Sequence, residues 1–425
     1  MHVAFAAMLP PFDFAGDLVT EPFVFEKEIS SDESLTLSDV RALSTKRRTL
    51  CAFRGNAGTP EDAAARSQAA DEYVPHLEAL VSRIEEFDVT ADRQKRFAFT
   101  WNSPLEGLGN TFKLNDIKQE LGMAWMLRAA AKRQEAVVAV DERPRALVGP
   151  ARHEQDDDRL ILIGGSVLDT PPPETNKTQT KEGTPKSPGP VLGESAPQIA
   201  TTLRAAAGVY KHTAQNILPQ LKDTLDGERP NELLASMAET MRLLCLAEAQ
   251  AATVRRAEER ATVNSLLIKL HLGACDLFSA ADKVLNDHVS DFNRISRKLQ
   301  ACILLGISVH RARAYRCAAE DAFAADEIGE AICLSDAGIK HLEKCVVAAS
   351  ESVRWKAAIF EEMENLVSSR SVYQKENEVV YFQKVPEKPK FRLPEGKVIV
   401  SEIERKDDPG GQTLFTNDKT DDKTV

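Results

Sequence analysis

The residue pair with the clearest capacity for chemistry in this sequence is His271 and Cys275. Their i, i+4 spacing would place an imidazole and a thiol on one face of a helix, where they could supply half of a zinc site. A complete site needs further ligands, and the sequence offers no second pair at a suitable spacing. We therefore favour a partly buried structural pair over a metal centre at these two residues.

Motifs that would indicate an enzyme are absent from the sequence. It contains no G-x-x-x-x-G-K-[ST], no G-x-G-x-x-G and no G-x-S-x-G, and Gly164-Gly-Ser166 lies in a proline-rich interval. The acidic pairs Glu258-Glu259 and Glu361-Glu362 are interpreted as solvated helix faces. We expect a protein with no cofactor and no enzymatic activity, and an enzyme remains the third hypothesis after two binding functions.

The element that would position His271 and Cys275 is a predicted helical hairpin. Its first helix is predicted over 231–259 and its second over 264–289, with a polar turn near 262–265. Apolar residues recur at three- and four-residue steps along the first helix, namely Leu243, Leu244, Ala247, Ala251, Val254 and Ala257. Small alanines on this helix would let a neighbouring helix approach closely. Further long helices are predicted on both sides of the hairpin.

Composition agrees with a large helical protein. The chain has 425 residues, of which 43% are hydrophobic but only 6% are aromatic, and this balance suits close-packed helices better than a sandwich or barrel. The net charge of −11 argues against a nucleic-acid partner. The seven cysteines form no C-x-x-C motif, so neither a zinc ribbon nor a disulfide framework is indicated, and a reduced cytoplasmic compartment is expected.

Three segments carry a specific family signature. They are Phe97-Ala-Phe-Thr100-Trp101, the stretch from Leu246-Ala-Glu-Ala-Gln250 to Leu266-Leu-Ile-Lys-Leu270, and Lys375-Glu-Asn-Glu-Val-Val-Tyr381-Phe-Gln-Lys-Val-Pro386. Together they resemble the BRO-one (BRO1) domain, the helical scaffold of Alix-like proteins of the endosomal sorting pathway. Other short segments are similar to the plant endosomal-targeting group of this family, for example Glu120-Leu-Gly-Met123 and Leu393-Pro-Glu-Gly-Lys397.

The resemblance implies a fold and a partner. The implied fold is all-α with a few short N-terminal strands, a bent helical solenoid with tetratricopeptide-like helix pairs. The implied function is a non-enzymatic adaptor in multivesicular-body sorting, which binds the C-terminal helix of an ESCRT-III subunit of the Snf-seven type in a hydrophobic concave patch. The patch positions of the family fall on Thr253, Leu266 and Leu270. Thr253 departs from the aromatic residue found in Alix, so a scaffold of the same fold with a different partner is the alternative.

The same resemblance implies a cytoplasmic protein that is peripheral on endosomes. No apolar run approaches the roughly 20 residues that a membrane-spanning helix needs. The basic runs Lys46-Arg-Arg48 and Arg93-Gln-Lys-Arg96 could contact an anionic endosomal membrane, although solvation of the surface is the simpler interpretation.

The expected domain organisation has three parts. Residues 1–21 are predicted to be a flexible N-terminus, 22–390 a BRO1-like domain, and 391–425 a charged C-terminal tail. Within the domain, 139–197 is proline-rich and is predicted to be a disordered insertion. The segment 22–29 alternates apolar and polar residues, which predicts a short strand. Val379, Val380, Tyr381 and Val385 are expected to form an apolar clasp that ends the domain. The chain beyond Pro386 is expected to be loose except for a strand-like 397–401.

Overall fold

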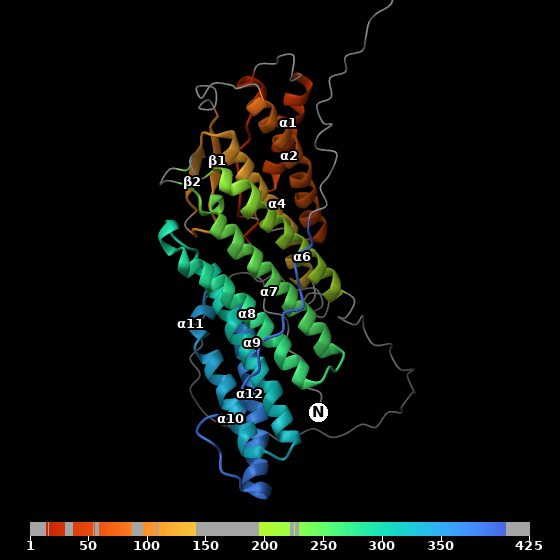
Figure 1. Ribbon diagram of the computed structural model, residues 1–425, viewed down its shortest axis with the longest axis vertical. Helices are drawn as coiled ribbons and strands as arrows, with labels where there is room; N and C mark the ends of the chain where they lie inside the picture. Colours follow the sequence, from red (N-terminus) through yellow and green to blue (C-terminus); the bar gives the residue numbers. More distant parts are fainter. Residues whose placement is uncertain are drawn as a thin grey trace, which may run out of the picture.

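A computed structural model shows an elongated, almost entirely helical molecule (Figure 1). The structure describes residues 14–15, 17–29, 37–53, 55, 59–86, 97–107, 109–141, 195–221, 225 and 229–404. The helices are α1 (Leu37–Ala52), α2 (Pro60–Glu86), α4 (Ile117–Asp141), α6 (Ser195–His212), α7 (Ala235–Glu259), α8 (Asn264–Asp287), α9 (Arg297–Ala324), α10 (Ile328–Glu343), α11 (Val346–Ala349) and α12 (Val353–Glu376). Two short strands, β1 (Phe99–Asn102) and β2 (Thr111–Leu114), form an antiparallel pair.

Successive helices pack side by side and build a bent solenoid, which confirms the predicted fold class. The chain of contacts runs from α2 to α4, α6, α7, α8, α9 and α10, and α12 then packs on α10. In Figure 1, α1 and α2 lie at one end of the molecule, and α10 and α12 at the other. The α7–α8 hairpin therefore lies in the middle of the solenoid, where it joins the two halves.

The aromatic segment that begins at Phe97 forms β1, as predicted. The neighbouring prediction of a strand over 22–29 is wrong, because Phe25–Lys27 is a turn of 3-10 helix. The rings of Phe23 and Phe25 pack on those of Phe97 and Phe99, so the alternating pattern reflects aromatic burial. An isolated bridge from Thr20 to Trp101 also connects this N-terminal segment to β1, and the N–H of Glu21 donates to the carbonyl of Thr100 over 3.3 Å.

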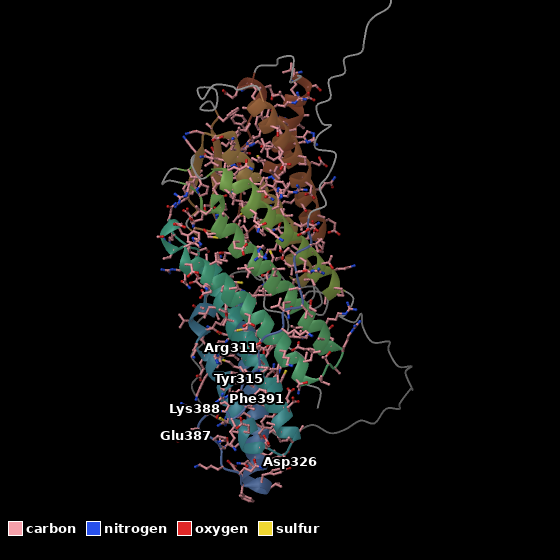
Figure 2. All side chains as sticks on the ribbon, viewed as in Figure 1. Arg311, Tyr315, Asp326, Glu387, Lys388 and Phe391 are labelled. Atoms are coloured by element: carbon pink, nitrogen blue, oxygen red, sulfur yellow. The ribbon has the colours of Figure 1, made fainter. Side chains whose placement is uncertain are left out.

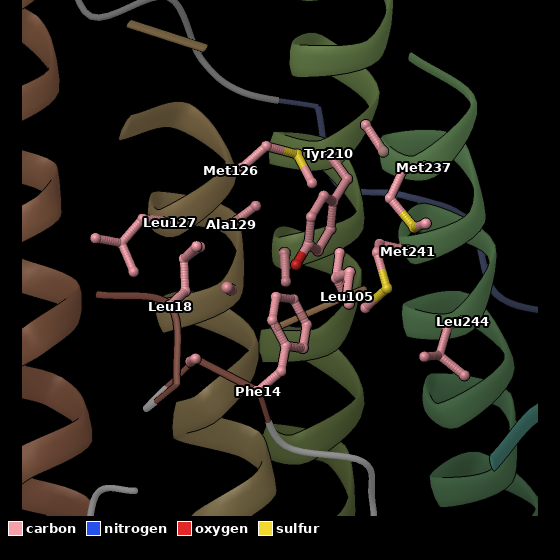
Figure 3. Close-up of a cluster of buried hydrophobic side chains, with 14 of the residues drawn as sticks. Phe14, Leu18, Leu105, Met126, Leu127, Ala129, Tyr210, Met237, Met241 and Leu244 are labelled. Atoms are coloured by element: carbon pink, nitrogen blue, oxygen red, sulfur yellow. The ribbon is translucent and has the colours of Figure 1, made fainter. Parts of the chain in front are cut away.

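The largest core cluster extends through most of the solenoid and includes the described part of the N-terminus. Phe14 and Leu18 are almost completely buried, and Figure 3 shows Phe14 beside Tyr210 of α6 and Leu18 beside Leu127 of α4. Residues 14–15 and 17–21 therefore differ from the expected flexible terminus. Burial of large apolar side chains such as these contributes about 1.5–3 kcal/mol each, which is enough to hold a short segment in place.

The C-terminal segment, residues 382–404, also differs from the expectation. It crosses the helices of the second half in an extended conformation instead of being loose, and it forms no ladder with another strand among the described residues. The predicted apolar clasp is wrong for Val379 and Val380, which are 74% and 63% exposed. Tyr381 packs partly buried against the core of this half, and its hydroxyl donates to a carboxylate oxygen of Asp326 over 2.7 Å.

Two predicted boundaries fall in or near residues that the structure leaves out. Helix α4 continues to Asp141 and α6 begins at Ser195, so the ends of the predicted 139–197 insertion are helical. The rest of that insertion lies outside the described residues. The division at residue 390 remains a prediction.

Candidate protein-binding surface

The three residues expected to bind a partner lie on the two helices of the central hairpin. Thr253 is on α7 and is half-buried, and its hydroxyl donates to the carbonyl of Ala249 over 2.9 Å. Leu266 is on the first turn of α8 and is also half-buried. Leu270 is one turn further along α8 and is only 4% exposed, so it does not form an accessible pair with Leu266.

The C-terminal segment lies across the hairpin at the level of Leu270. Gln250 of α7 makes the connection, because its side-chain amide donates to the carbonyls of Leu270 (3.2 Å) and Lys397 (3.0 Å). Its carbonyl oxygen accepts from the backbone N–H of Ile399 at 3.1 Å. The N–H of Lys397 in turn donates to the carbonyl of Lys269 on α8 over 2.8 Å. Since these bonds bracket Leu270, the segment contributes to its burial.

Two helix glycines give the C-terminal segment room to approach. A β-carbon at Gly273 of α8 would lie 2.3 Å from the carbonyl oxygen of Lys397, and one at Gly208 of α6 would lie 2.0 Å from that of Ile403. Both distances are far below van der Waals contact. Glycine within a helix costs about 1 kcal/mol relative to alanine, so these two positions favour the close approach of the segment at the expense of local helix stability.

Ion pairs and hydrogen bonds hold the end of the described segment on α6 and α7. Glu402 lies 2.8 Å from the ammonium of Lys211 and 3.4 Å from the guanidinium of Arg242. The pKa of Glu402 is lowered, chiefly by its hydrogen bond with Lys211. Arg204 donates to the carbonyl of Ser401 over 2.7 Å, and its own carbonyl accepts from Ile403. The segment is therefore attached to three successive helices.

Further along the chain, α10 holds the start of the C-terminal segment. One carboxylate oxygen of Glu330 accepts from the backbone N–H groups of Lys390 and Phe391, at 2.7 and 3.0 Å. Figure 2 shows Lys388 and Phe391 along this path, beside the second half of the solenoid. The segment thus runs from α10 across α8 to α6.

These contacts create a surface that none of the helices would form alone. We define the hairpin surface as Thr253, Leu266 and Leu270 with Val398 and Ile399 of the C-terminal segment. Val398 and Ile399 remain 43% and 49% exposed, although the backbone between them is fixed by Gln250. Accessible aliphatic side chains on a rigid support are what an amphipathic helix needs when it binds through its apolar face.

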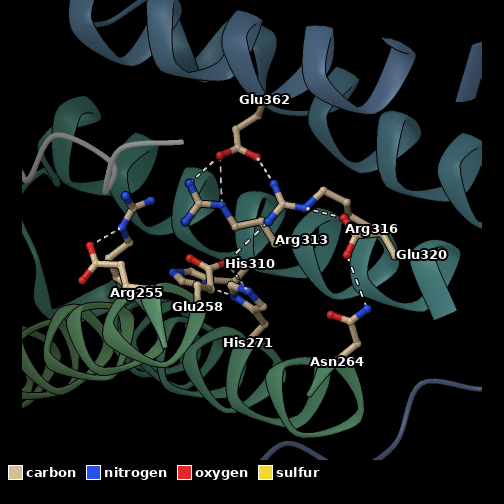
Figure 4. Close-up of polar contacts among 10 residues, drawn as sticks. Arg255, Glu258, Asn264, His271, His310, Arg313, Arg316, Glu320 and Glu362 are labelled. Carbon is tan, nitrogen blue, oxygen red and sulfur yellow. Dashed lines mark hydrogen bonds and ion pairs between the residues drawn. The ribbon is translucent and has the colours of Figure 1, made fainter. Parts of the chain in front are cut away.

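A buried polar network lies beside the hairpin surface and joins α7, α8, α9 and α12 (Figure 4). Glu258 accepts from His271 at 3.1 Å and lies 3.4 Å from Arg316. Arg313 donates to Glu362 over 2.9 Å. The prediction that Glu258 and Glu362 belong to solvated faces is therefore wrong, because both are buried and paired with cations.

The protonation states in this network follow from its hydrogen bonds. Burial acts to raise the pKa of Glu258, but the hydrogen bond from His271 and the charges of Arg313 and Arg316 lower it to about 2. A carboxylate can only accept, so Nε2 of His271 donates and its Nδ1 is the acceptor in the neutral ring. Nδ1 of His310, 3.1 Å away, must then donate. Burial lowers the pKa of both histidines, which favours these neutral forms.

His271 and Cys275, the candidate half-site for zinc, instead lie buried in the core. His271 is fully buried with both ring nitrogens in hydrogen bonds, and burial raises the pKa of the Cys275 thiol. No group of three or more potential metal ligands occurs among the residues that the structure describes. All seven cysteines are free and buried.

The basic run at 46–48 offers fewer charges to an anionic membrane than its sequence indicates. Arg47 is completely buried and donates to the carboxylate of Glu120 over 3.0 Å. Lys46 is half-buried in an ion pair with Glu72 at 3.2 Å, so only Arg48 of this run is exposed and free of a described ion pair. The second basic run, 93–96, lies outside the described residues.

Sequence periodicity could not identify the contribution of the C-terminal segment to the surface. Gln250 is a polar residue within an apolar helix, and this local anomaly is one signal in the sequence. Gly208 and Gly273 give a second signal in retrospect, since both interrupt helices that otherwise favour helical residues. Neither signal specifies which distant segment fills the space.

The fold and the hairpin surface together define an all-helical solenoid scaffold. A sequence model of the BRO1-like domain matches residues 194–418, which is more than half of the chain, and the chain belongs to this family. The BRO1 domain is a protein-interaction fold. Among the described residues, no helix combines the length and apolar character required to cross a membrane.

Comparison with individual proteins gives the same family. The BRO1 domain-containing protein BROX of Homo sapiens is 28% identical over 215 residues, covering 48% of this chain and 51% of the relative. BROX of Xenopus tropicalis is 27% identical over 219 residues, with the same coverage. The match thus spans about half the length of each curated relative.

Solved structures show the same fold over nearly the whole chain. ALIX in complex with the SIVmac239 PYKEVTEDL late domain superposes with a TM-score of 0.62 and 15% identity, over 97% of this chain and 50% of ALIX. The complex of the ALIX BRO1 domain with CHMP4C gives a TM-score of 0.58 and 14% identity, over 95% of both chains. A BRO1 domain studied for endosomal targeting gives 0.58 and 14%, over 96% of this chain and 95% of that one.

Proposed function

We propose that this protein is a non-enzymatic adaptor that binds the C-terminal amphipathic helix of an ESCRT-III subunit at the hairpin surface. Family membership and the existence of an ALIX BRO1 complex with CHMP4C support this partner class. Endosomal targeting by a BRO1 domain of similar fold supports a cytoplasmic protein that is peripheral on endosomes. In this proposal the ESCRT-III subunit brings the protein to the endosome, with any contact to anionic lipid being secondary.

The observation that carries the proposal is the exposure of aliphatic side chains on an immobilised backbone. Leu266, Val398 and Ile399 are accessible, and Gln250 fixes the two chain segments that bear them. Little conformational entropy is lost when such a surface binds, so its apolar area contributes more fully to affinity. An incoming helix would cover these side chains with its own apolar face.

A second candidate function is a scaffold of the same fold that binds a different partner. Thr253 presents a hydroxyl that is already bonded to Ala249, and Leu270 is buried. Two of the three residues implied by the family resemblance therefore offer little apolar area. This observation favours either a modest affinity for ESCRT-III helices or a partner with a smaller apolar face.

Calorimetry with the full chain distinguishes the two functions. The ligand is a synthetic C-terminal helix of an ESCRT-III subunit of the Snf-seven type, and the control is the same peptide with its apolar-face leucines changed to serine. The proposed function predicts saturable binding of the first peptide and none of the second. Equal heats for both peptides would reject the ESCRT-III function, and capture from a lysate of the source organism would then be used to find another partner.

A further inference from the structure

A cavity at the first turn of α9 lies far from the hairpin surface. Its volume is about 680 Å³, within the range of roughly 300–1,000 Å³ that is usual for small-molecule sites. Its walls come from the N-terminal segment, from β1 and the turn that follows it, and from the start of α9, with Gly55 and Glu351 also lining it. The start of α9 follows the C-terminal end of α8 in the chain, whereas Leu266 lies at the N-terminal end of α8. A helix of this length spans about 30–35 Å.

The start of α9 supplies unsatisfied hydrogen-bond donors. The backbone N–H groups of Arg297, Lys298 and Leu299 have no acceptor among the described residues, as expected for the first turn of a helix. Ser296 occupies the N-cap position, but its side chain does not cap the helix. The positive end of the macrodipole of this long helix therefore lies at the cavity.

Ser296 provides an independent indication of a ligand. It is only 4% exposed, it lines the cavity, and its hydroxyl has no hydrogen-bond partner within the part of the chain that the structure describes. Serine at an N-cap normally bonds to the N–H two or three residues further on. A hydroxyl that forgoes this bond and lines a cavity is available to a bound group.

The turn after β1 is held rigidly against Ser296. Glu232 accepts from the hydroxyl of Ser103 at 2.5 Å and from the N–H of Leu105 at 3.1 Å. The carbonyl of Leu105 in turn accepts from the backbone N–H of Ser296 at 2.7 Å. Gly107, with a positive φ of 79°, lies so close that a β-carbon there would be 3.2 Å from the Cα of Ser296. The cavity is thus bounded by fixed backbone at this point.

The charges around the cavity limit what it can hold. Arg294, Arg297 and Lys298 are exposed and make no ion pair with any described carboxylate. Three acidic residues also line the cavity, namely Asp17, Glu106 and Glu351. Glu106 is engaged by the side-chain amides of Asn110 (3.2 Å) and Asn293 (3.1 Å). Because the formal charges balance, a compact anion placed at the helix start is favoured over a polyanion.

We propose that this cavity binds a phosphate monoester, with the phosphate at the first turn of α9 and the remainder of the molecule in the cavity. The N–H groups of the first turn and the Ser296 hydroxyl would donate to the phosphate oxygens. Arg297 and Lys298 would neutralise its charge. The monoester could belong to a soluble metabolite or to a phosphorylated lipid headgroup, which share this chemistry.

The test uses the full chain and two probes. Inorganic phosphate is titrated by NMR while the amide signals of the first turn of α9 are followed, and phosphatidylcholine vesicles are compared with and without phosphatidylinositol monophosphate. The variant Arg297→Gln/Lys298→Gln should weaken phosphate binding by at least about tenfold. Ser296→Ala should weaken it by a smaller factor. The matched control Lys388→Gln/Lys390→Gln, at the far end of the molecule, should bind as the wild type does.

The outcomes separate the sources and decide the proposal. Phosphate binding without a preference for the lipid vesicles identifies a soluble monoester, and a preference that is lost in Arg297→Gln/Lys298→Gln identifies a headgroup. Either result supports the site. The proposal is overturned if the wild type shows no saturable shift and no vesicle preference, or if the control variant loses binding to the same extent. The test is independent of ESCRT-III binding, since none of its variants lies on the hairpin surface.

Discussion

Gln250 donates a hydrogen bond to the carbonyl of Lys397 over 3.0 Å, although the two residues are 147 positions apart in the chain. The same amide also bonds Leu270 and Ile399, so its donors and its acceptor are all used within the protein. A buried amide is costly unless it is paired in this way. The hairpin and the C-terminal segment are therefore one structural unit.

Replacement of Gln250 by leucine should release the C-terminal segment from the hairpin. The change leaves the carbonyl of Lys397 and the N–H of Ile399 without their side-chain partner, which should cost about 1–3 kcal/mol of unfolding free energy. Amide hydrogen exchange over 397–403 should rise sharply, with a lower melting temperature. The exposed Gln68→Leu on α2 serves as the control and should change neither quantity. Unchanged protection of 397–403 would contradict the structural role given to Gln250.

The change Gly273→Ala provides a test in which helix propensity predicts the opposite sign. In a free helix, alanine would stabilise by about 1 kcal/mol relative to glycine. Here its β-carbon would overlap the carbonyl of Lys397, so we expect a net loss of stability and faster exchange over 397–403. Thermal denaturation measures the first effect. A variant more stable than the wild type would show that the segment does not press on α8.

Chains of two lengths test where the folded unit ends. A chain ending at Glu404 keeps the described bonds of the segment at Glu330, Gln250 and Arg204, and it is the reference for the comparison. A chain ending at Pro389 loses the bonds at Glu330, Gln250 and Arg204 and should melt at a lower temperature. Equal melting of the chains ending at 389 and 404 would restore the boundary near 390 that the sequence predicts.

The buried network predicts a specific pH dependence of stability. The pKa values of His271 and His310 are lowered by burial, so the unfolded chain, with histidine pKa values near 6.5, takes up these protons first as the pH falls. Stability should therefore decrease below about pH 6.5, by at most about 1.4 kcal/mol per pH unit for each histidine. Glu258, with its pKa lowered to about 2, should add a further loss only below about pH 4.

Melting temperatures between pH 7.5 and 5 measure this effect. His310→Asn removes one of the two buried titrating groups and should flatten the profile, even if it lowers the melting temperature overall. His288→Asn removes an exposed histidine and should leave the shape of the profile unchanged. Identical slopes for the wild type and His310→Asn would show that the pair is protonated in the folded state.

The sequence predicts the helices well because each is long and strongly periodic. The hairpin from Ala235 to Asp287 lies within a few residues of its predicted bounds. What could not be predicted depends on contacts between distant segments. Burial of Leu270 and the roles of Gly208 and Gly273 depend on the C-terminal segment, which local patterns describe as loose. Val379 and Val380 look like core residues by type, yet after α12 no described element covers them.

Within the proposed binding surface, the structure distinguishes Leu266 from Leu270, which the sequence treats as equivalent. Leu270→Asp should unfold or strongly destabilise the protein, because it buries a charge without a partner. A folded Leu270→Asp variant with the melting temperature of the wild type would contradict the burial of this side chain. It would also restore the accessible Leu266–Leu270 pair implied by the family resemblance.

The central claim is that the hairpin surface binds an ESCRT-III helix, and calorimetry of the Leu266→Asp variant tests it most directly. Leu266 is half-buried at the start of α8, so the aspartate should be tolerated in the fold but not under an apolar helix. The control is Leu37→Asp, which changes a 41% exposed leucine on α1 at the far end of the solenoid. We predict that Leu266→Asp keeps its melting temperature within a few degrees and weakens peptide binding at least about tenfold, whereas Leu37→Asp binds as the wild type does. Wild-type affinity in a folded Leu266→Asp protein would contradict the claim.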